Sequence, residues 1–450
     1  MTPEKGDILH TEPDDGYRGV WYYNQPLDSE YRFKYSGGLG TYPQQIHPLA
    51  CYAPEVGKTF FCYGGSPRTR NEVTHMVSYF DHAVGTVPRP RRLVGKETSD
   101  AHDMTALAID EEGHLWIFSN SHGLSRPSWV HRSTEPYGIE EFEVMADFNF
   151  SYSQPWWLPG RGLLLLHTHY TGDERGAMRR LFWRTTRDGR QWSERRLLAF
   201  FQRGHYQVSA RRGRRVGTAF NHHPEPGGLN ERTNLYYLET DDAGKTWRTA
   251  GGEPVEMPLE ERDNSALAVD WEAEGLLCYL KTLQFDAEGR PVILFLTSPG
   301  FESGPANDPR IWRTARWTGQ EWRVRDVTTS DNNYDFGPLY VEGNGTWRLI
   351  APTGTGPQPY NPGGEVEMWL SEDEGETWRK TAELTRGSDR NHTYVRRPVN
   401  IHPDFYALWA DGHARQLSRS CLYFVSRAGD RVRRLPPQME SDSAEPEKWA

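Results

Sequence analysis

Histidines gather at two recurring places in this sequence: in the polar residues before certain short apolar runs, and in those after the next run. Imidazole exchanges protons near neutral pH and also binds metal ions. Random scatter would not produce this spacing, so the sequence predicts that many imidazoles face one pocket. Nine of the 16 histidines lie at these places, namely His102, His122, His167, His169, His205, His222, His223, His392 and His413.

Tyr152, Tyr206 and Tyr334 share these polar loops, whereas few carboxylates do. A glycoside hydrolase ordinarily places two carboxyl groups across the bond that it breaks. Breaking a uronic-acid linkage by β-elimination instead needs a cation for the carboxylate, a base for the C5 proton and an acid for the leaving oxygen. Histidine and tyrosine suit both proton transfers. The composition therefore favours a lyase whose partner is a uronic-acid-containing oligo- or polysaccharide.

A metal centre is another use for so many imidazoles. The closest spacing is His167-Thr168-His169, and no His-Glu-x-x-His motif accompanies it. Catalytic zinc sites ordinarily draw three ligands from a defined scaffold. We therefore expect no cofactor and no catalytic metal, while a structural metal ion of unknown identity stays open.

Internal repeats reveal the elements that must position these residues. Two segments fit the Asp-box pattern, 240–247 (TDDAGKTW) and 371–378 (SEDEGETW), and weaker copies end at Trp192 and Trp322. In such a box, Asp and Gly shape a tight hairpin and the tryptophan packs between neighbouring blades. The boxes are thus structural, and we expect Trp247 and Trp378 to pack in this way.

An apolar strand precedes each box, and this strand recurs seven times. The copies lie about 50–57 residues apart, with one longer step that indicates an insertion near residues 283–308. Because a four-stranded blade needs roughly 40–50 residues, the count predicts an all-β fold, a seven-bladed β-propeller with Asp-box repeats. The copies begin at Met76, Trp129, Leu181, Leu235, Ile311, Met368 and Leu422.

Residues 1–438 are predicted to form this single propeller, and residues 439–450 a loose, acidic tail. In each blade the second strand runs antiparallel to the first, so the two histidine-bearing positions return to the same face. Loops from all blades converge at the mouth of a propeller channel. We expect one site there.

Charge and hydropathy exclude other classes. The net charge of −10 is modest, and the basic run 211–215 (RRGRR) is typical of a hairpin turn rather than a nucleic-acid surface. No stretch is long and apolar enough to cross a membrane. We expect no nucleic-acid or membrane partner. The chain as given should be soluble and cytoplasmic, with a secreted or periplasmic location open if a signal peptide has been removed, and the oligomeric state is unknown.

Several stretches make the chain resemble the BNR-4 propellers of carbohydrate-active enzymes, a group of ulvan lyases, rhamnose–glucuronate lyases and α-L-rhamnosidases. The resemblance covers nearly the whole chain and implies the fold and a carbohydrate substrate. It rests on the Asp boxes and on GYRGVWYYNQP (16–26), KYSGGLGTYPQQIHP (34–48), TFFCYGG (59–65), SDAHD (99–103), GHYQVS (204–209) and NHTYVRRPVNIHPDFYALWADGH (391–413).

For a lyase, the resemblance implies that His102, His122 and Tyr152 are catalytic and that Tyr206 lines the pocket. Where the lyases have an arginine that neutralises the uronate, this chain has His169. His169 as imidazolium, His167, Arg396 or Arg397 are the candidates to replace it. The expected substrate-binding residues are His169, His167, His205, Tyr206, His222, Tyr334, His392 and Arg396.

Two other functions stay open. The rhamnosidases resemble this chain at His47, which implies a glycoside hydrolase acting on the same linkage from the opposite face. A non-catalytic carbohydrate-binding propeller is the second alternative, although near-identical pockets in each blade would be expected of it. A sialidase would need three clustered arginines and a Tyr–Glu pair, a set that we do not find.

Overall fold

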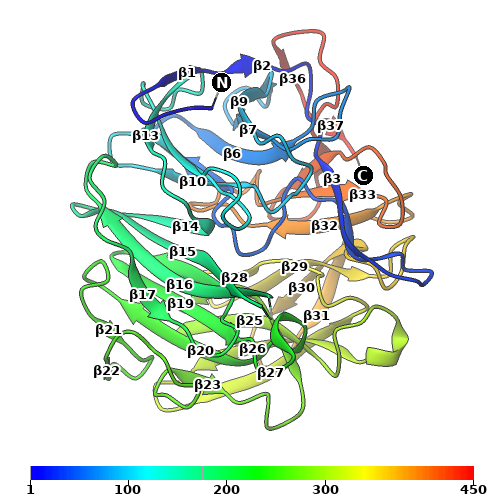
Figure 1. Ribbon diagram of the computed structural model, residues 1–450. Coiled ribbons are helices and arrows are strands. Elements are labelled where there is room, and N and C mark those ends of the chain that lie inside the picture. The colour runs from blue at the N-terminus through cyan, green and yellow to red at the C-terminus, as the bar shows by residue number, and fades with distance from the viewer. Residues whose placement is uncertain (1, 175, 450) are drawn as a thin grey trace. The chain divides into compact units, whose positions relative to one another are not determined.

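The computed structural model describes residues 2–174 and 176–449. Met1, Arg175 and Ala450 lie outside the described residues, and with them the outer ends of the predicted segments 1–438 and 439–450. Nearly all regular structure is β-strand, arranged as the seven sheets of a seven-bladed β-propeller (Figure 1). The predicted fold class is confirmed.

The first two sheets each add an N-terminal strand to four sequential ones. The first has the order β2-β9-β7-β6-β5 and consists of Glu12–Pro13, Arg91–Gly95, Thr74–Asp81, Lys58–Gly65 and Ala50–Ala53. The second has the order β1-β13-β12-β11-β10 and consists of Ile8–His10, Glu141–Ala146, Trp129–Ser133, Leu115–Ser119 and Thr105–Ile109. A ribbon pairs β3 (Trp21–Pro26) with β4 (Phe33–Gly38).

The next three sheets follow chain order. The third is β14 to β17, namely Ser151–Leu158, Gly162–Asp173, Gly176–Thr186 and Arg196–Ala199. The fourth is β18 to β22, namely Gln207–Arg212, Arg215–His222, Thr233–Thr240, Trp247–Arg248 and Pro254–Val255, with β23 (Leu267–Val269) paired to β20. The fifth is β24 to β27, namely Leu277–Phe285, Pro291–Ser298, Arg310–Trp317 and Trp322–Ser330.

The last two sheets complete the seven. The sixth is β28 to β31, namely Leu339–Val341, Trp347–Gly354, Glu365–Ser371 and Arg379–Glu383. The seventh is β32-β33-β34-β35-β37, namely Asn391–Arg396, Ala407–Gly412, Leu422–Val425, Val432–Arg434 and Glu447–Lys448. A ribbon pairs β36 (Ser443–Ala444) with β8 (Val87–Pro88), and two short 3-10 helices are η1 (Gly228–Glu231) and η2 (Pro305–Asn307).

Each repeated apolar strand is the third strand of its sheet, in the series β7, β12, β16, β20, β26, β30 and β34. The insertion, however, does not lie near residues 283–308, since these are mainly the regular strands β24 and β25 and the loop that follows. The additional residues instead lie between β20 and β24, where they form β21, β22 and β23. Short strands in an irregular segment leave no strong periodic signal, which is why the sequence misplaced them.

The Asp box at 240–247 shows why these residues form a hairpin. The Asp242 carboxylate accepts the Thr246 hydroxyl at 2.7 Å and the backbone N–H groups of Lys245 and Thr246 at 2.9 and 3.0 Å. Gly244 has φ +79°, and a Cβ there would lie 2.4 Å from the Trp183 indole nitrogen. Glycine is thus needed for both its conformation and the close approach.

The two box tryptophans differ in burial. Trp247 is 2% exposed and packs edge-on against Trp183 of the preceding sheet, with ring centroids 5.5 Å apart. This contact is the predicted packing between blades. Trp378 is only half-buried, and its indole N–H donates to the Gly375 carbonyl at 3.2 Å. Its contact in this structure lies within its own hairpin.

By the packing of its backbone, the chain divides into two compact units: residues 1–157, 354–366 and 383–450, and residues 158–353 and 367–382. Within the first unit, the first and last sheets join. Val399 accepts the Tyr52 N–H at 2.9 Å, and its own N–H donates to Ala50 at 2.8 Å. A shared apolar core continues this junction, with Phe61 stacked on Phe405 at 5.6 Å.

The acidic tail differs from the loose segment that we expected. Met439 is 5% exposed within the core of this junction, and β36 and β37 pair with β8 and β35. Apolar anchoring and an ion pair between Arg434 and Glu447 order the tail despite its composition. Among the described residues, no helix is long and apolar enough to span a membrane.

Substituting Trp247 by alanine should lower stability by about 3–5 kcal/mol, since a buried indole is removed and a cavity remains. Trp378→Ala, at the matching but half-exposed position, should cost clearly less. Thermal and urea unfolding of both variants measure the difference. Equal losses would show that burial against the preceding sheet does not distinguish the two boxes.

Candidate active site

The pairing of β10 with β11 brings His102 and His122 together. Thr105 opposes Ser119 in this hairpin, and each histidine lies three residues beyond that pair. The two imidazole rings stack, with centroids 4.0 Å apart and planes 17° apart. Strand direction predicted that the two residues reach the same face and the family resemblance implied that they act together, and the structure brings their rings into contact.

One carboxylate holds both rings. His102 donates from Nδ1 to Asp100 Oδ1 at 2.6 Å, and His122 donates from Nδ1 to Asp100 Oδ2 at 2.7 Å. Burial would raise the pKa of the Asp100 carboxyl, but the two imidazoles, His102 first, hold that pKa well below its ordinary value. An ionised Asp100 fixes the tautomer of each ring, so both Nε2 atoms carry the lone pair.

His102 stays neutral near pH 7. Its pKa is lowered to about 4, first by burial and then by the neighbouring His122, while Asp100 opposes both effects. Side-chain exposure separates the two rings, because His102 is 4% exposed and His122 is 24% exposed. His122 is thus the imidazole of the pair that a ligand can reach.

Tyrosines surround the pair. Tyr42 donates its hydroxyl to His102 Nε2 at 2.5 Å, and the Tyr35 hydroxyl lies 3.4 Å from the same nitrogen. Tyr152 has its ring centroid 6.2 Å from that of His102 and 6.3 Å from that of His122. Its φ is +52°, a strained value for an aromatic residue, and such strain concentrates at functional sites.

Tyr22 lies at the same site, edge-on to His102 with centroids 5.8 Å apart. Burial and the Asp100 charge raise the pKa of its hydroxyl, so Tyr22 keeps its proton. The sequence did not predict that Tyr22, Tyr35 and Tyr42 lie at this site, and it did not predict the role of Asp100. The only signal was that all four fall in stretches shared with the carbohydrate-active propellers.

A second carboxylate, Asp103, anchors the hairpin from behind. It accepts the His122 backbone N–H at 2.8 Å and a two-pronged contact from Arg126 at 2.7 and 2.8 Å. Arg126 also reaches Asp100, at 3.5 Å. The buried Lys96 ammonium lies 3.7 Å from Asp103. Arg126, missed in the sequence, is therefore a guanidinium that contacts both carboxylates of this hairpin.

Asp100, His102 and His122 could offer a metal ion three ligand atoms within 4.8 Å of one another. Both Nδ1 atoms and both carboxylate oxygens are already engaged with each other, however. A cation bound through these atoms would displace two short, charge-assisted hydrogen bonds. The donor set fits proton transfer better than metal binding.

Two other expected residues of the first unit, His47 and Arg396, have partners outside the paired-histidine cluster. His47 is half-buried and edge-on to Trp156 at 5.6 Å, and burial, with Arg396 and Arg397, holds its pKa well below the ordinary value. Arg396 is 2% exposed and donates to the carbonyls of Pro43 and Ile46. Its guanidinium is committed to the backbone, so a role in substrate binding is not supported.

His392 is also buried, with protein partners at both ring nitrogens. Its Nδ1 accepts the Trp409 indole N–H at 2.9 Å, and its Nε2 lies 3.0 Å from the Ser388 hydroxyl. Burial lowers its pKa to about 3. Both ring nitrogens have protein partners, and the substrate-binding role of His392 stays a prediction.

In the second unit, three expected histidines are buried. His205 donates from Nδ1 to Asn221 at 2.8 Å and accepts the Phe201 N–H at 3.2 Å, so neither nitrogen faces a ligand. His167 stacks on Phe182, and His222 binds the Gln202 amide at 2.9 Å. Periodicity placed these residues correctly along the strands but did not reveal their internal partners.

His169 is half-buried, and its pKa is lowered to about 4 by burial and then by Arg195 and Arg180. It is neutral at pH 7, so it does not supply the positive charge that an imidazolium would give. The expectation of a cationic His169 is therefore not supported.

Cations of the second unit lie instead beside Tyr206 and Tyr334. The Arg232 guanidinium is buried and donates to the Tyr334 hydroxyl at 3.1 Å, and it lies over the Tyr206 ring at 5.3 Å. Arg179 lies over the Tyr206 ring at 5.4 Å and is half-buried. His223, beside Tyr206, has no hydrogen-bond partner at either ring nitrogen among the described residues. This cluster suits an anionic ligand.

The fold and the paired-histidine cluster define a β-propeller of the Asp-box type with a candidate proton-transfer site in its second blade. The profile of the BNR repeat-containing family matches residues 76–330, more than half of the chain. The chain therefore belongs to the BNR repeat-containing family.

Ulvan lyases are among the proteins that are similar to this chain. A protein named ulvan lyase, from Nonlabens ulvanivorans, is 25% identical over 350 residues, which are 69% of this chain and 70% of that protein. A solved PL25 ulvan lyase superposes with a TM-score of 0.68 at 17% identity, covering 92% of this chain and 96% of that one. A solved PL25 ulvan lyase bound to -[GlcA(1-4)Rha3S]- gives a TM-score of 0.68 at 16% identity, covering 93% of this chain and 96% of that one. At these identities, the structural match establishes the fold.

The buried neutral histidines predict acid sensitivity. His102, His205 and His392 have folded-state pKa values of about 4, 3 and 3, below the ordinary 6.5 of an unfolded chain. Their contribution to stability is complete above pH 6.5 and falls with decreasing pH, by up to about 1.4 kcal/mol per pH unit for each group. Urea unfolding between pH 7.5 and 4 should show this decline. His205→Gln should reduce the slope and the exposed His10→Gln should not, whereas constant stability down to pH 4 would contradict the assignment.

Proposed function

We propose that this protein is a polysaccharide lyase that cleaves a uronic-acid-containing glycan, such as a rhamnose–glucuronate linkage, by β-elimination. The observation that carries the proposal is the pair of stacked imidazoles held on one carboxylate, with tyrosine hydroxyls around them. The match to an ulvan lyase and to a lyase structure containing a glucuronate–rhamnose unit supports the substrate class.

The reaction needs a base, an acid and no carboxylate pair. The base removes the C5 proton, the electron pair left behind forms the C4–C5 double bond, and the bond between C4 and its oxygen breaks. The acid then protonates that oxygen as it leaves. We assign the base to His122, because its ring is the more exposed and its Nδ1–H is held by Asp100. Its Nε2 lone pair is thereby directed away from Asp100.

Tyr152 is our candidate for the acid that protonates the leaving oxygen. Its ring lies beside both imidazoles and its backbone is held in a strained conformation. A phenol has a pKa near 10 and is protonated at neutral pH, as an acid must be. Such a group need not ionise before the substrate binds.

His102 and Tyr42 form a relay behind this pair. Asp100 accepts a hydrogen bond from the Nδ1–H of His102, and His102 Nε2 accepts one from the Tyr42 hydroxyl at 2.5 Å. The arrangement has the logic of a hydroxyl, imidazole and carboxylate in line, which raises the basicity of the hydroxyl oxygen. We propose that this relay holds His102 and Tyr42 in place beside His122, which remains the base.

The second unit has a cluster of cationic side chains around Tyr206. The guanidinium groups of Arg179 and Arg232 both lie over the Tyr206 ring, and neither ring nitrogen of the neighbouring His223 has a hydrogen-bond partner among the described residues. Guanidinium groups recognise carboxylate and sulfate by charge and by their forked N–H geometry. We propose that this cluster binds an anionic sugar group.

Activity on a panel of uronic-acid polysaccharides should separate lyase from hydrolase. His102→Ala and His122→Ala should reduce turnover at least ~10²-fold, since each removes part of the proton-transfer system. His47→Ala should keep most of the activity. Ultraviolet absorbance reports the unsaturated uronate, and reducing ends report every cleavage. New reducing ends without absorbance, lost in His47→Ala and kept in His102→Ala, would favour the rhamnosidase-like hydrolase.

Removing single hydroxyl groups tests the tyrosines. Tyr152→Phe keeps the ring and should lower turnover by about 10²–10⁴-fold. Tyr42→Phe should lower it as well, and should also change the pH profile, because the His102 relay is lost. Tyr17→Phe, which removes a buried hydroxyl bonded to Ser78 and Pro88, is the matched control and should keep its activity. Wild-type turnover in Tyr152→Phe would make that residue structural.

A further inference from the structure

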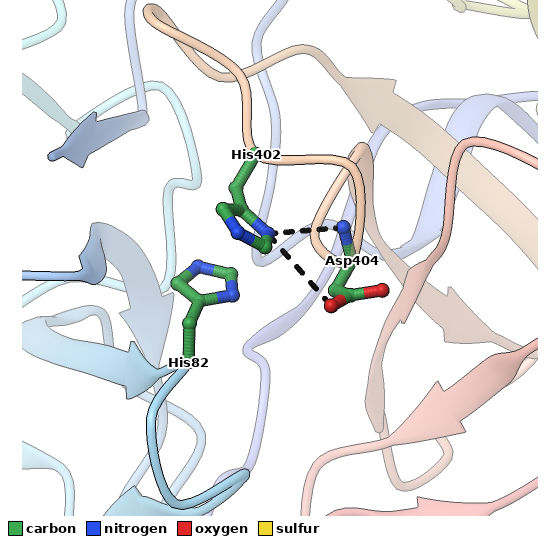
Figure 2. Close-up of side chains that lie close together, drawn as sticks. All are labelled: His82, His402 and Asp404. Atoms are coloured by element: carbon green, nitrogen blue, oxygen red, sulfur yellow. Dashed lines mark hydrogen bonds and ion pairs between the residues drawn. The ribbon is translucent and has the colours of Figure 1, made fainter.

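A second histidine cluster lies where the first and last sheets join. His82 directly follows β7, and His402 and Asp404 lie in the loop between β32 and β33. Figure 2 shows the two imidazoles facing each other, with Asp404 beside His402. One ligand atom from each residue lies within 4.8 Å of the other two. The cluster thus draws on segments about 320 residues apart in the chain.

Aromatic packing holds the two rings in contact. Their centroids are 3.6 Å apart, and Tyr52 lies edge-on to both, at 5.3 Å from His82 and 4.9 Å from His402. Phe80 packs edge-on to His82 at 4.9 Å. A site whose rings are fixed by packing loses little entropy when it binds a ligand.

His82 has the hydrogen-bonding pattern of a metal ligand. Its Nε2 lies 2.8 Å from the Thr59 hydroxyl, while its Nδ1 is buried and has no partner among the described residues. When Nε2–H donates to Thr59, Nδ1 carries a lone pair that no protein group satisfies. Metal-bound histidines are ordinarily oriented by such a hydrogen bond from the other ring nitrogen. An unsatisfied buried acceptor also costs free energy, which a cation would relieve.

Asp404 supplies the negative charge. One carboxylate oxygen pairs with Arg431, and the other lies 4.0 Å from His402 Nδ1. The Asp404 backbone N–H donates to this Nδ1 at 3.1 Å (Figure 2). A cation coordinated by His402 Nδ1 would replace the Asp404 N–H as the partner of the Nδ1 lone pair. It would also attract the Asp404 carboxylate oxygen that lies nearby. Two imidazoles and one carboxylate leave a position for water, the ligand set that zinc accepts.

We propose that His82, His402 and Asp404 bind one divalent transition-metal ion of the zinc type, and that this ion fastens the junction between the first and last blades. The site contains none of the residues assigned to the proposed elimination reaction. It lies on the same junction as the Val399 pairing and the core around Phe405. A cross-link there would oppose opening of the ring, so the expected role is stabilisation.

Zinc binding to the full-length protein tests the proposal. After treatment with EDTA, the protein should bind one equivalent of Zn²⁺ by equilibrium dialysis, and Ca²⁺ or Mg²⁺ should not replace it. At about a hundredfold excess over the dissociation constant, the melting temperature should rise by ~2–5 °C. His402→Ala should lose both effects, and Thr59→Val should weaken binding by about 10–100-fold.

Controls distinguish this cluster from the paired histidines of the candidate active site. His122→Ala should keep the zinc equivalent, and Arg431→Met should keep it while losing the Asp404 ion pair. Asp404→Asn is the second ligand variant should His402→Ala not fold, and it too should lose the rise in melting temperature. Stoichiometric binding that survives His402→Ala or Asp404→Asn, or no binding to the wild type, would overturn the proposal.

Discussion

The candidate active site depends on one interaction, the acceptance of two imidazole N–H groups by the Asp100 carboxylate. A buried carboxylate is tolerated only when its oxygens are well satisfied. Here the oxygens take both Nδ1–H groups, and Oδ1 also takes the His102 backbone N–H at 3.0 Å. The same bonds that stabilise the charge set both tautomers. Without Asp100, the two stacked rings would have no common acceptor for their Nδ1–H groups, and nothing would fix the lone pair on Nε2 in both.

The propeller places histidines at the same position in more than one blade, but their surroundings differ. His102 and His392 both lie at the entry to the first strand of a blade. At His102, the partners are a carboxylate and a tyrosine hydroxyl, whereas at His392 they are an indole and a serine hydroxyl. The first set can move a proton and the second only holds the ring. The position in the fold therefore fixes where a histidine lies, and its partners determine what it can do.

This distinction explains how far the sequence could predict the structure. Asp boxes and repeated strands are local patterns, so the blade number followed from spacing. Strand direction placed His102 and His122 on the same face, and the family resemblance implied their pairing. Tyr42 lies 60 residues from His102, in a segment without periodicity, and only the folded chain joins them. The internal partners of His205 and His392 are likewise invisible in a residue pattern. The sequence therefore overstated the number of histidines open to a ligand.

In the first unit, the contacts that join the last blade to the first also position part of the candidate active site. Arg396, in the last blade, holds the segment 43–46 through the carbonyls of Pro43 and Ile46. Tyr394, from the same strand, packs edge-on against Tyr42 with centroids 4.8 Å apart, and its φ of +49° shows that its backbone is strained as well. Tyr42 in turn bonds His102 of the second blade. Because residues of the last blade hold Tyr42 and the segment around it, a cross-link that secures the junction would also hold the hydroxyl that bonds His102.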